Sequence, residues 1–363
     1  MKIMGSPLGP RMVVDGHQVD YFCGTSYYTL HGDPRVIDAA CRATREYGMG
    51  PATHMTSPPL VEVEQAAARF FDTEAAAYII SGYLTDMTLL QALRDEYQTI
   101  FVDGAGHYSL FDGLMSTGKR IVRVHHLDVA DLERALRAEL RPGELPLVAT
   151  DGVFPVTGAI APLAEYARLL EGYAGGLLCV DDSHALGVIG EKGQGSLEYC
   201  GVQGEGRYVA GTLSKAFGGL GGIIPGPRSL IEKIGANARV PVGASPPTSG
   251  AAAAAAMGIK ILSENPQMRT RLWENVARVR GGLRRLGVDT GDSPIPIVAV
   301  HGVRGIDLSR VQLELERQGI LVAYVPPHGY SDAPGTGLLR VAVFSTHTDA
   351  QLDRLLEALG RLI

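Results

Sequence analysis

Short apolar runs alternate with amphipathic segments through the first two thirds of the chain. The apolar runs predict buried strands at 76–80, 99–102, 121–124, 147–150, 177–180 and 208–210. Helical periodicity lies between most of these runs, at 85–94, 129–140 and 163–170. Because this alternation is typical of a mostly parallel sheet covered by helices on both faces, we expect an α/β fold.

The pattern changes after about residue 225. Apolar positions there predict helices at 249–262, 266–286, 308–318 and 349–362, with short strands at 297–300 and 338–343. We therefore expect a large domain over 46–264 and a smaller α+β domain over 265–363. Residues 1–45 predict an extended arm followed by a helix that begins at Asp33-Pro34.

Composition narrows the class of protein. The 363 residues are 45% hydrophobic and 20% charged, which is typical of a soluble globular enzyme. The net charge of −6 and the absence of a basic run argue against nucleic acid or an anionic membrane as partner. No apolar stretch has the length of a signal peptide or a membrane span, so we expect a cytoplasmic protein. The four cysteines are scattered and indicate neither a zinc site nor a disulfide framework.

One loop, Gly211–Gly219, combines a lysine with hydroxyl side chains and glycines. Lys215 follows the predicted strand 208–210, and open α/β sheets bind their ligands just past such strand ends. A lysine can form a Schiff base there, Thr212 and Ser214 can donate hydroxyl hydrogens to a phosphate, and the glycines let backbone approach an anion. The combination suggests pyridoxal 5′-phosphate (PLP), and the alternative is an ordinary surface turn.

Polar residues follow two other predicted strands. Ser81, Gly82 and Tyr83 come after 76–80 and open a helix, which makes either an anion site or a simple serine N-cap. His107 follows the strand at 99–102. Its flat imidazole can stack on a heteroaromatic ring, and the alternative is a solvated loop histidine.

Asp181 and His184 follow the apolar run 177–180. A carboxylate there is costly to bury unless it meets a cation, and the protonated pyridine nitrogen of PLP is such a cation. Asp181 would keep this nitrogen protonated and so preserve the ring as an electron sink. His184 would bond the phenolic oxygen of the ring or orient the substrate. A metal site is the competing interpretation, but no further ligand has suitable spacing, and we favour PLP.

Two further roles follow from residue chemistry. Once an amino substrate displaces Lys215, its free amine can remove the α-proton as a general base. In the C-terminal domain, Arg340 can take a substrate carboxylate in a bidentate grip, although it could equally be a surface arginine.

The motifs occur in the order found in one known family. They are Ser81-Gly82-Tyr83, Asp103-x-x-x-His107-x-Ser109, Asp181-x-x-His184-x-x-Gly187, Gly211-Thr212-x-Ser214-Lys215, and Arg340 with His347-Thr348. Over nearly its whole length the chain resembles the α-oxoamine synthases, which include 8-amino-7-oxononanoate synthase, glycine C-acetyltransferase and serine palmitoyltransferase.

The resemblance implies a fold-type I PLP-dependent transferase, similar to aspartate aminotransferase, that works as a homodimer with its active site at the subunit interface. Such enzymes condense an amino acid with an acyl thioester, from coenzyme A or a carrier, and usually release carbon dioxide. The implied roles are the Schiff base for Lys215, the pyridine nitrogen for Asp181, ring stacking for His107, the phenolic oxygen for His184, phosphate contacts for Gly82, Tyr83 and Thr212, and the substrate carboxylate for Arg340.

Departures from the family pattern lie on the substrate side. Ser26 stands where the family has an asparagine that helps to hold the amino acid, so Ser26 becomes the substrate-binding candidate. Pro155-Val156-Thr157 replaces a Ser-Met-Asp run beside the cofactor, and the segments 51–59 and 241–243 also differ. These changes suggest an unusual amino or acyl substrate.

Two alternatives remain on the same scaffold. One is a PLP-dependent aldolase or decarboxylase. The other is a silent partner subunit, which the presence of both Lys215 and Asp181 argues against.

Overall fold

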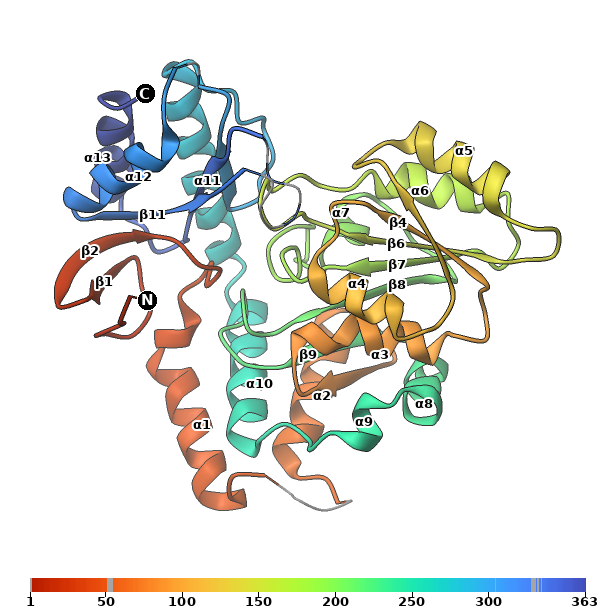
Figure 1. Cartoon of the computed structure of the whole chain (residues 1–363). Coiled ribbons are helices and arrows are strands. Elements are labelled where there is room, and N and C mark those ends of the chain that lie inside the picture. Colours follow the sequence, from red (N-terminus) through yellow and green to blue (C-terminus); the bar gives the residue numbers. More distant parts are fainter. Residues whose placement is uncertain (1, 51–54, 304, 328–330, 332, 334) are drawn as a thin grey trace. The chain divides into compact units, whose positions relative to one another are not determined.

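The computed structural model describes residues 2–50, 55–303, 305–327, 331, 333 and 335–363 (Figure 1). They form two compact units. The smaller unit consists of Met1–Asp33, Pro155–Ala159 and Asn265–Ile363, and the larger unit consists of Pro34–Phe154 and Ile160–Glu264. The segment 51–59 differs from the family pattern, and its residues 51–54 lie outside the described residues.

The larger unit is built on a seven-stranded sheet in the order β3-β9-β8-β7-β6-β4-β5. The strands are β3 Ala75–Ile79, β4 Thr99–Asp103, β5 Arg120–Val124, β6 Pro146–Asp151, β7 Leu177–Asp181, β8 Arg207–Thr212 and β9 Gly222–Gly226. The pairs from β8 to β5 are parallel, and β9 runs antiparallel to both β8 and β3. All strands except β9 therefore point the same way, which confirms the expected mostly parallel sheet.

Helices cover both faces of this sheet (Figure 1). The helices of the larger unit are α1 Pro34–Tyr47, α2 Pro58–Phe70, η2 Gly82–Leu84, α3 Thr85–Ala92, α4 Tyr108–Met115, α5 Val129–Glu139, α6 Leu163–Leu170, α7 Ser196–Tyr199, α8 Arg228–Asn237, α9 Val240–Gly243 and α10 Ser249–Glu264. Every residue of β4, β6 and β7 is buried, because side chains on both faces of these central strands meet helices. This explains why the strands read as continuous apolar runs rather than alternating ones.

The smaller unit has a five-stranded sheet in the order β1-β2-β11-β12-β10. Its elements are β1 Arg11–Val14, β2 His17–Phe22, η1 Leu30–Gly32, α11 Gln267–Arg285, β10 Ile297–Val300, α12 Leu308–Arg317, β11 Ile320–Val325, β12 Leu338–Ala342 and α13 Asp349–Gly360. Apolar side chains of α11, α12 and α13 form one core with β2, β10, β11 and β12. The unit is thus α+β.

The division into 1–45, 46–264 and 265–363 stays a prediction, and the structure differs from it in two details. The expected extended arm forms the hairpin β1–β2 in the smaller unit's sheet, whereas helix α1 lies in the larger unit and packs on α10. Residues Pro155–Ala159 belong to the smaller unit although they interrupt the larger one in sequence. Within the described residues, no helix combines the length and the apolar character needed to cross a membrane.

Candidate active site

Lys215 lies just beyond the carboxyl end of β8. The chain turns back tightly after the strand, since the amide of Leu213 donates to Gly221 O at 2.9 Å and that of Gly219 donates to Leu213 O at 3.0 Å. Lys215 Nζ is 3.0 Å from Nε2 of His184, which follows the neighbouring strand β7. The loop therefore brings an amine and an imidazole into direct contact at the edge of the sheet.

A cavity of about 200 Å³ surrounds this contact. The nine residues that the sequence predicts as cofactor contacts all line it, which agrees with the rule that ligands bind at the carboxyl ends of parallel strands. Its walls are Ser81, Gly82, Tyr83, His107, Ser109, Asp151, Asp181, Ser183, His184, Thr212, Ser214 and Lys215.

One end of the cavity is suited to an anion. The Tyr83 amide donates to Ser81 Oγ at 3.2 Å, and the short helix η2 then leads into α3, so backbone amides at this start carry the positive end of a helix dipole. Across from them, the hydroxyls of Thr212 and Ser214 lie 2.7 Å apart. A Cβ on Gly82 would come within 2.4 Å of Thr212 Cβ, so only glycine allows the two segments to meet.

The other end holds buried carboxylates. The Ser109 hydroxyl lies 3.1 Å from Asp86 Oδ2 and 3.4 Å from Asp181 Oδ2, and the amide of His107 donates to Asp151 Oδ2 at 2.8 Å. Burial, together with the negative charge of Asp181, raises the pKa of both Asp86 and Asp151 well above the usual range of a carboxyl. Across the described ranges, no group of three His, Cys, Asp or Glu side chains is arranged to hold a metal ion.

Sequence reasoning missed Asp86 and Asp151. Asp151 ends strand β6, so the strand-end rule that identified Asp181 could have found it. Asp86 lies in α3 beside threonines and a methionine, and no periodicity shows that its side chain is buried.

His107 is the N-cap of α4, a helix that the sequence analysis did not predict. Its Nδ1 accepts the amide hydrogen of Ser109 at 3.1 Å and lies 2.7 Å from the Ser109 hydroxyl. Burial lowers the pKa of His107. The ring is therefore a neutral imidazole held in a fixed orientation on the wall of the cavity.

These residues fit PLP. The close approach of Gly82 to Thr212 leaves room and hydrogen-bond donors for a phosphate. The buried carboxylates are suited to a cationic ring nitrogen, which would compensate their negative charge. Lys215 supplies the amine that a pyridoxal aldehyde requires.

The two predicted substrate contacts lie in the smaller unit. Arg340, on β12, is 9% exposed and donates from Nε to Pro155 O at 2.6 Å and from Nη1 to Gly24 O at 3.1 Å. Ser26 is buried, and its hydroxyl is 2.5 Å from His31 Nδ1. Both side chains thus already have protein partners.

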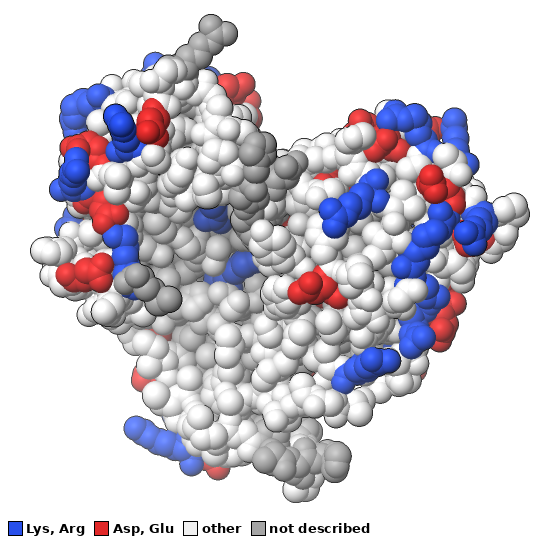
Figure 2. All heavy atoms as spheres, in the orientation of Figure 1, with Lys and Arg blue, Asp and Glu red and all other residues white. Residues whose placement is uncertain are grey.

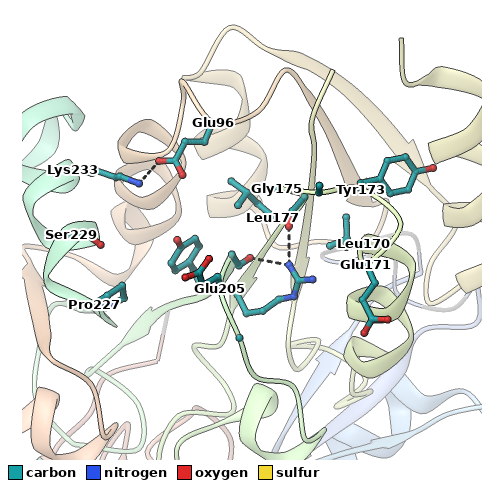
Figure 3. A pocket seen from close by; sticks show the side chains of 16 residues that line it. Glu96, Leu170, Glu171, Tyr173, Gly175, Leu177, Glu205, Pro227, Ser229 and Lys233 are labelled. Atoms are coloured by element: carbon teal, nitrogen blue, oxygen red, sulfur yellow. Dashed lines mark hydrogen bonds and ion pairs between the residues drawn. The ribbon is translucent and has the colours of Figure 1, made fainter. Parts of the chain in front are cut away.

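A larger groove of about 860 Å³ lies at the amino ends of β7 and β8 (Figure 3). Its cations are partnered within the protein: Lys233 pairs with Glu96 at 2.6 Å, and Arg207 donates to Gly176 O at 2.8 Å. Since ligands of such sheets bind at the opposite edge, we do not assign the active site to this groove.

Charges of both signs are interspersed over the side of the larger unit that carries α5 (Figure 2). Arg134 pairs with Asp131 at 2.7 Å and Arg137 pairs with Glu133 at 2.5 Å. This side of the unit has no field of one sign to attract a polyanion.

The chain is similar in sequence and in structure to known proteins of the kind expected from its motifs. Residues 22–359 match the family described as aminotransferase class I and II. The chain is 37% identical to 8-amino-7-oxononanoate synthase of Thioalkalivibrio sulfidiphilus, over 97% of this chain and 90% of that protein. It is 34% identical to the enzyme of the same name from Thermosipho melanesiensis, over 98% and 91%. Among solved structures, serine palmitoyltransferase from S. paucimobilis with a bound PLP–myriocin aldimine matches with a TM-score of 0.92 and 27% identity, over 100% of this chain and 92% of that one.

Proposed function

This chain belongs to the class I and II aminotransferase family and, within it, to the α-oxoamine synthases, and we propose that it uses PLP to condense an amino acid with an acyl thioester. It has the fold-type I architecture expected from the sequence. The observation that carries the proposal is the 3.0 Å contact of Lys215 Nζ with His184 Nε2, inside a cavity with an anion end and a carboxylate end.

Each end of the cavity has a proposed task. Ser81, Gly82, Tyr83, Thr212 and Ser214 would hold the phosphate through backbone amides and hydroxyls. At the other end Asp181 would face the ring nitrogen, and His107 would stack on the ring. When bound, PLP supplies an electron sink that stabilises negative charge on the α-carbon of the amino acid.

Lys215 and His184 would handle the proton. The Lys215 amine removes the α-proton of the amino acid as general base. His184 Nε2, 3.0 Å away, accepts a hydrogen bond from Nζ and so orients the amine toward its substrate. The carbon that has lost its proton would then attack the thioester carbonyl, so that a carbon–carbon bond replaces the carbon–sulfur bond and the thiol leaves with a proton. An α-amino acid that keeps its carboxylate would lose carbon dioxide afterwards, and a proton would take its place on the α-carbon.

The test is a direct assay of carbon–carbon bond formation. Purified protein is incubated with PLP, with glycine, alanine or serine, and with acyl thioesters of coenzyme A and of a carrier protein. We expect an α-amino ketone by mass spectrometry from one pair, and none with Lys215→Ala. No bond formation over the whole panel would refute the acyltransferase proposal.

A second candidate is an aldolase or decarboxylase on the same scaffold. What favours it is that the chain departs from the family pattern on the substrate side, at Ser26 and at Pro155-Val156-Thr157. Release of an aldehyde or carbon dioxide without any thioester in the same assay would select this candidate.

We further propose a homodimer with interfacial active sites. The larger unit exposes large apolar side chains, among them Tyr108, Met115, Leu220 and Val242, the last 77% exposed. Sedimentation is expected to give twice the mass of the chain, and Val242→Glu is expected to shift it toward the monomer. A wild-type protein that sediments as a monomer at micromolar concentration would contradict the dimer.

A further inference from the structure

The Ser109 hydroxyl stands at the centre of a buried hydrogen-bond network. Its oxygen lies 2.7 Å from His107 Nδ1, 3.1 Å from Asp86 Oδ2 and 3.4 Å from Asp181 Oδ2. The hydroxyl carries one hydrogen, so it can donate to one of these three acceptors at a time. The network therefore lacks a hydrogen unless another member is protonated.

His107 does not supply it. Nδ1 of His107 accepts the amide hydrogen of Ser109 at 3.1 Å, so this nitrogen carries no hydrogen of its own. The missing hydrogen must therefore lie on a carboxyl, either Asp86 or Asp181.

The surroundings of the two carboxyls differ. Asp181 Oδ1 accepts the amide hydrogen of Ser183 at 3.0 Å, and an amide donor stabilises a carboxylate. Asp86 is 3% exposed, and the donor that the structure gives it is the shared Ser109 hydroxyl. Asp86 also lies within hydrogen-bonding reach of Asp181.

Three titratable groups on two strands act on Asp86. They are Asp181 and Cys179 on β7 and Asp151 on β6, with Ser109 of α4 as the polar contact. None of these groups is a cation, and burial with two nearby carboxylates raises the pKa of Asp86 well above its usual range. Both arguments place the hydrogen on Asp86.

We infer that Asp86 is a positioning residue of the cofactor site, a neutral carboxylic acid that donates its hydrogen to Asp181 and so leaves the Ser109 hydroxyl to hold His107. This inference rests on the proposed function, because Asp181 and His107 are the groups proposed to face the PLP ring. Asp86 itself would not touch the cofactor. It would fix two side chains that do.

Asparagine is expected to replace a neutral Asp86 with little loss. In Asp86→Asn the amide NH₂ can donate to Asp181 as the neutral acid does, and the Ser109 hydroxyl keeps its hydrogen for His107. Asp86→Leu has a similar branched shape and cannot donate. We expect the dissociation constant of PLP in Asp86→Asn to stay within about twofold of wild type, and that of Asp86→Leu to rise about tenfold, the size of one lost buried hydrogen bond.

A second measurement serves if Asp86→Leu does not fold. The visible absorption of bound PLP is followed against pH in wild type and Asp86→Asn. Wild type is expected to show one more transition as pH rises, when Asp86 loses its hydrogen, and Asp86→Asn is expected to lack it. A merely structural role would leave the two titrations the same.

The outcomes separate the two proposals. If wild type binds PLP and Asp86→Asn loses it as Asp86→Leu does, Asp86 acts as an anion and the inference is overturned. Identical titrations and identical dissociation constants in all three proteins overturn it as well. If wild-type protein itself binds no PLP, the proposed function fails first, and this inference falls with it.

Discussion

At the level of single residues, the contact between Gly82 and Thr212 joins the start of η2 to the end of β8, two segments that lie far apart in the sequence. The ideal Cβ position on Gly82 is 2.4 Å from Thr212 Cβ and 2.5 Å from its hydroxyl oxygen. Since Thr212 is β-branched and buried, it cannot move aside as the tip of a long side chain would.

Gly82→Ala is therefore expected to weaken PLP binding by about tenfold or more and to lower the melting temperature, because Thr212 and the η2 amides are pushed apart. Equilibrium titration with PLP and thermal melting measure the two effects. The matched control is Gly235→Ala in α8, where an added Cβ meets nothing within 4 Å. That change is expected to stabilise the protein by about 0.5–1 kcal/mol through helix propensity. Similar behaviour of both variants would contradict the close-approach argument.

Asp182 gives a pH prediction. Its side chain is buried, and its Oδ2 accepts the Ser196 amide hydrogen at 2.8 Å. Burial raises the pKa of Asp182 from 3.8 to about 7. The unfolded chain loses this proton near pH 3.8, whereas the folded protein keeps it until about pH 7. The contribution of Asp182 to the free energy of unfolding thus falls between these pH values and levels off above them.

Asp182→Asn removes this dependence. Urea unfolding from pH 4 to 8 is expected to show the wild-type free energy of unfolding falling relative to that of the variant up to about pH 7. Asp95→Asn, whose side chain is 82% exposed, serves as control and should follow wild type. A wild-type minus Asp182→Asn difference that is flat with pH would show that Asp182 is not buried as a neutral acid.

The residues at strand ends were within reach of sequence reasoning, and those in helices were not. Asp181 and Lys215 follow apolar runs, so the pattern itself marks their place at the edge of the sheet. Asp86 and Ser109 are buried in α3 and α4, where serine and aspartate are also common on exposed faces.

At the level of elements, β12 has a particular task in the smaller unit. It lies between β11 and β10, and Arg340 at its middle binds two backbone carbonyls, one of which belongs to the segment Pro155–Ala159. The planar guanidinium can serve both acceptors, and a lysine ammonium has no comparable fork.

Arg340→Lys is expected to cost about 1–3 kcal/mol in the free energy of unfolding, because one buried carbonyl is left without a donor. Denaturant unfolding measures it. The control is Arg317→Lys in α12, an arginine side chain that is 75% exposed and pairs with Glu314, and we expect a change below about 0.5 kcal/mol. Equal small losses in both variants would mean that Arg340 does not secure this segment.

Two elements that escaped prediction, β9 and α4, contain residues that are unusual for their type of element. Strand β9 reads Gly-Ile-Ile-Pro-Gly, and glycine and proline at its ends are typical of a turn. Helix α4 begins at a histidine cap and contains a glycine, Gly113, whose Cβ would meet the α3 backbone at 2.8 Å. Long periodic helices such as α10 and α11 were found because their packing faces recur every turn.

At the level of the whole molecule, all residues proposed to hold PLP belong to the larger unit. The α/β class could be predicted since continuous apolar strands repeat there with helices between them. The hairpin β1–β2 has a local signal that the sequence analysis did not use, the two-residue turn Asp15-Gly16 with both residues at positive φ. The pairing of β2 with β11, some three hundred residues away, has no local signal.

Hydrogen exchange should report the location of the cofactor. Adding PLP is expected to slow exchange at 81–86, 107–115, 181–184 and 212–215, because ligand binding stabilises the structure that it contacts. In a single protomer, the strands of the smaller unit are expected to exchange at the same rate with and without PLP. Mass spectrometry with and without PLP, and with Lys215→Ala, checks this. Protection confined to the smaller unit would contradict the assigned site.

The antiparallel strand β9 has a consequence for folding of the protein during its synthesis on the ribosome. It is the strand that joins β3 to β8, pairing Ala75 with Gly226 and Thr212 with Gly222. The segment with Ser81 is made early, but it has no neighbour in the sheet until β9 has been translated and has emerged. A nascent chain that stops short of residue 222 therefore contains Lys215, but the residues proposed to bind the phosphate are not yet assembled. The cofactor can be bound only after β9 has paired with β3 and β8.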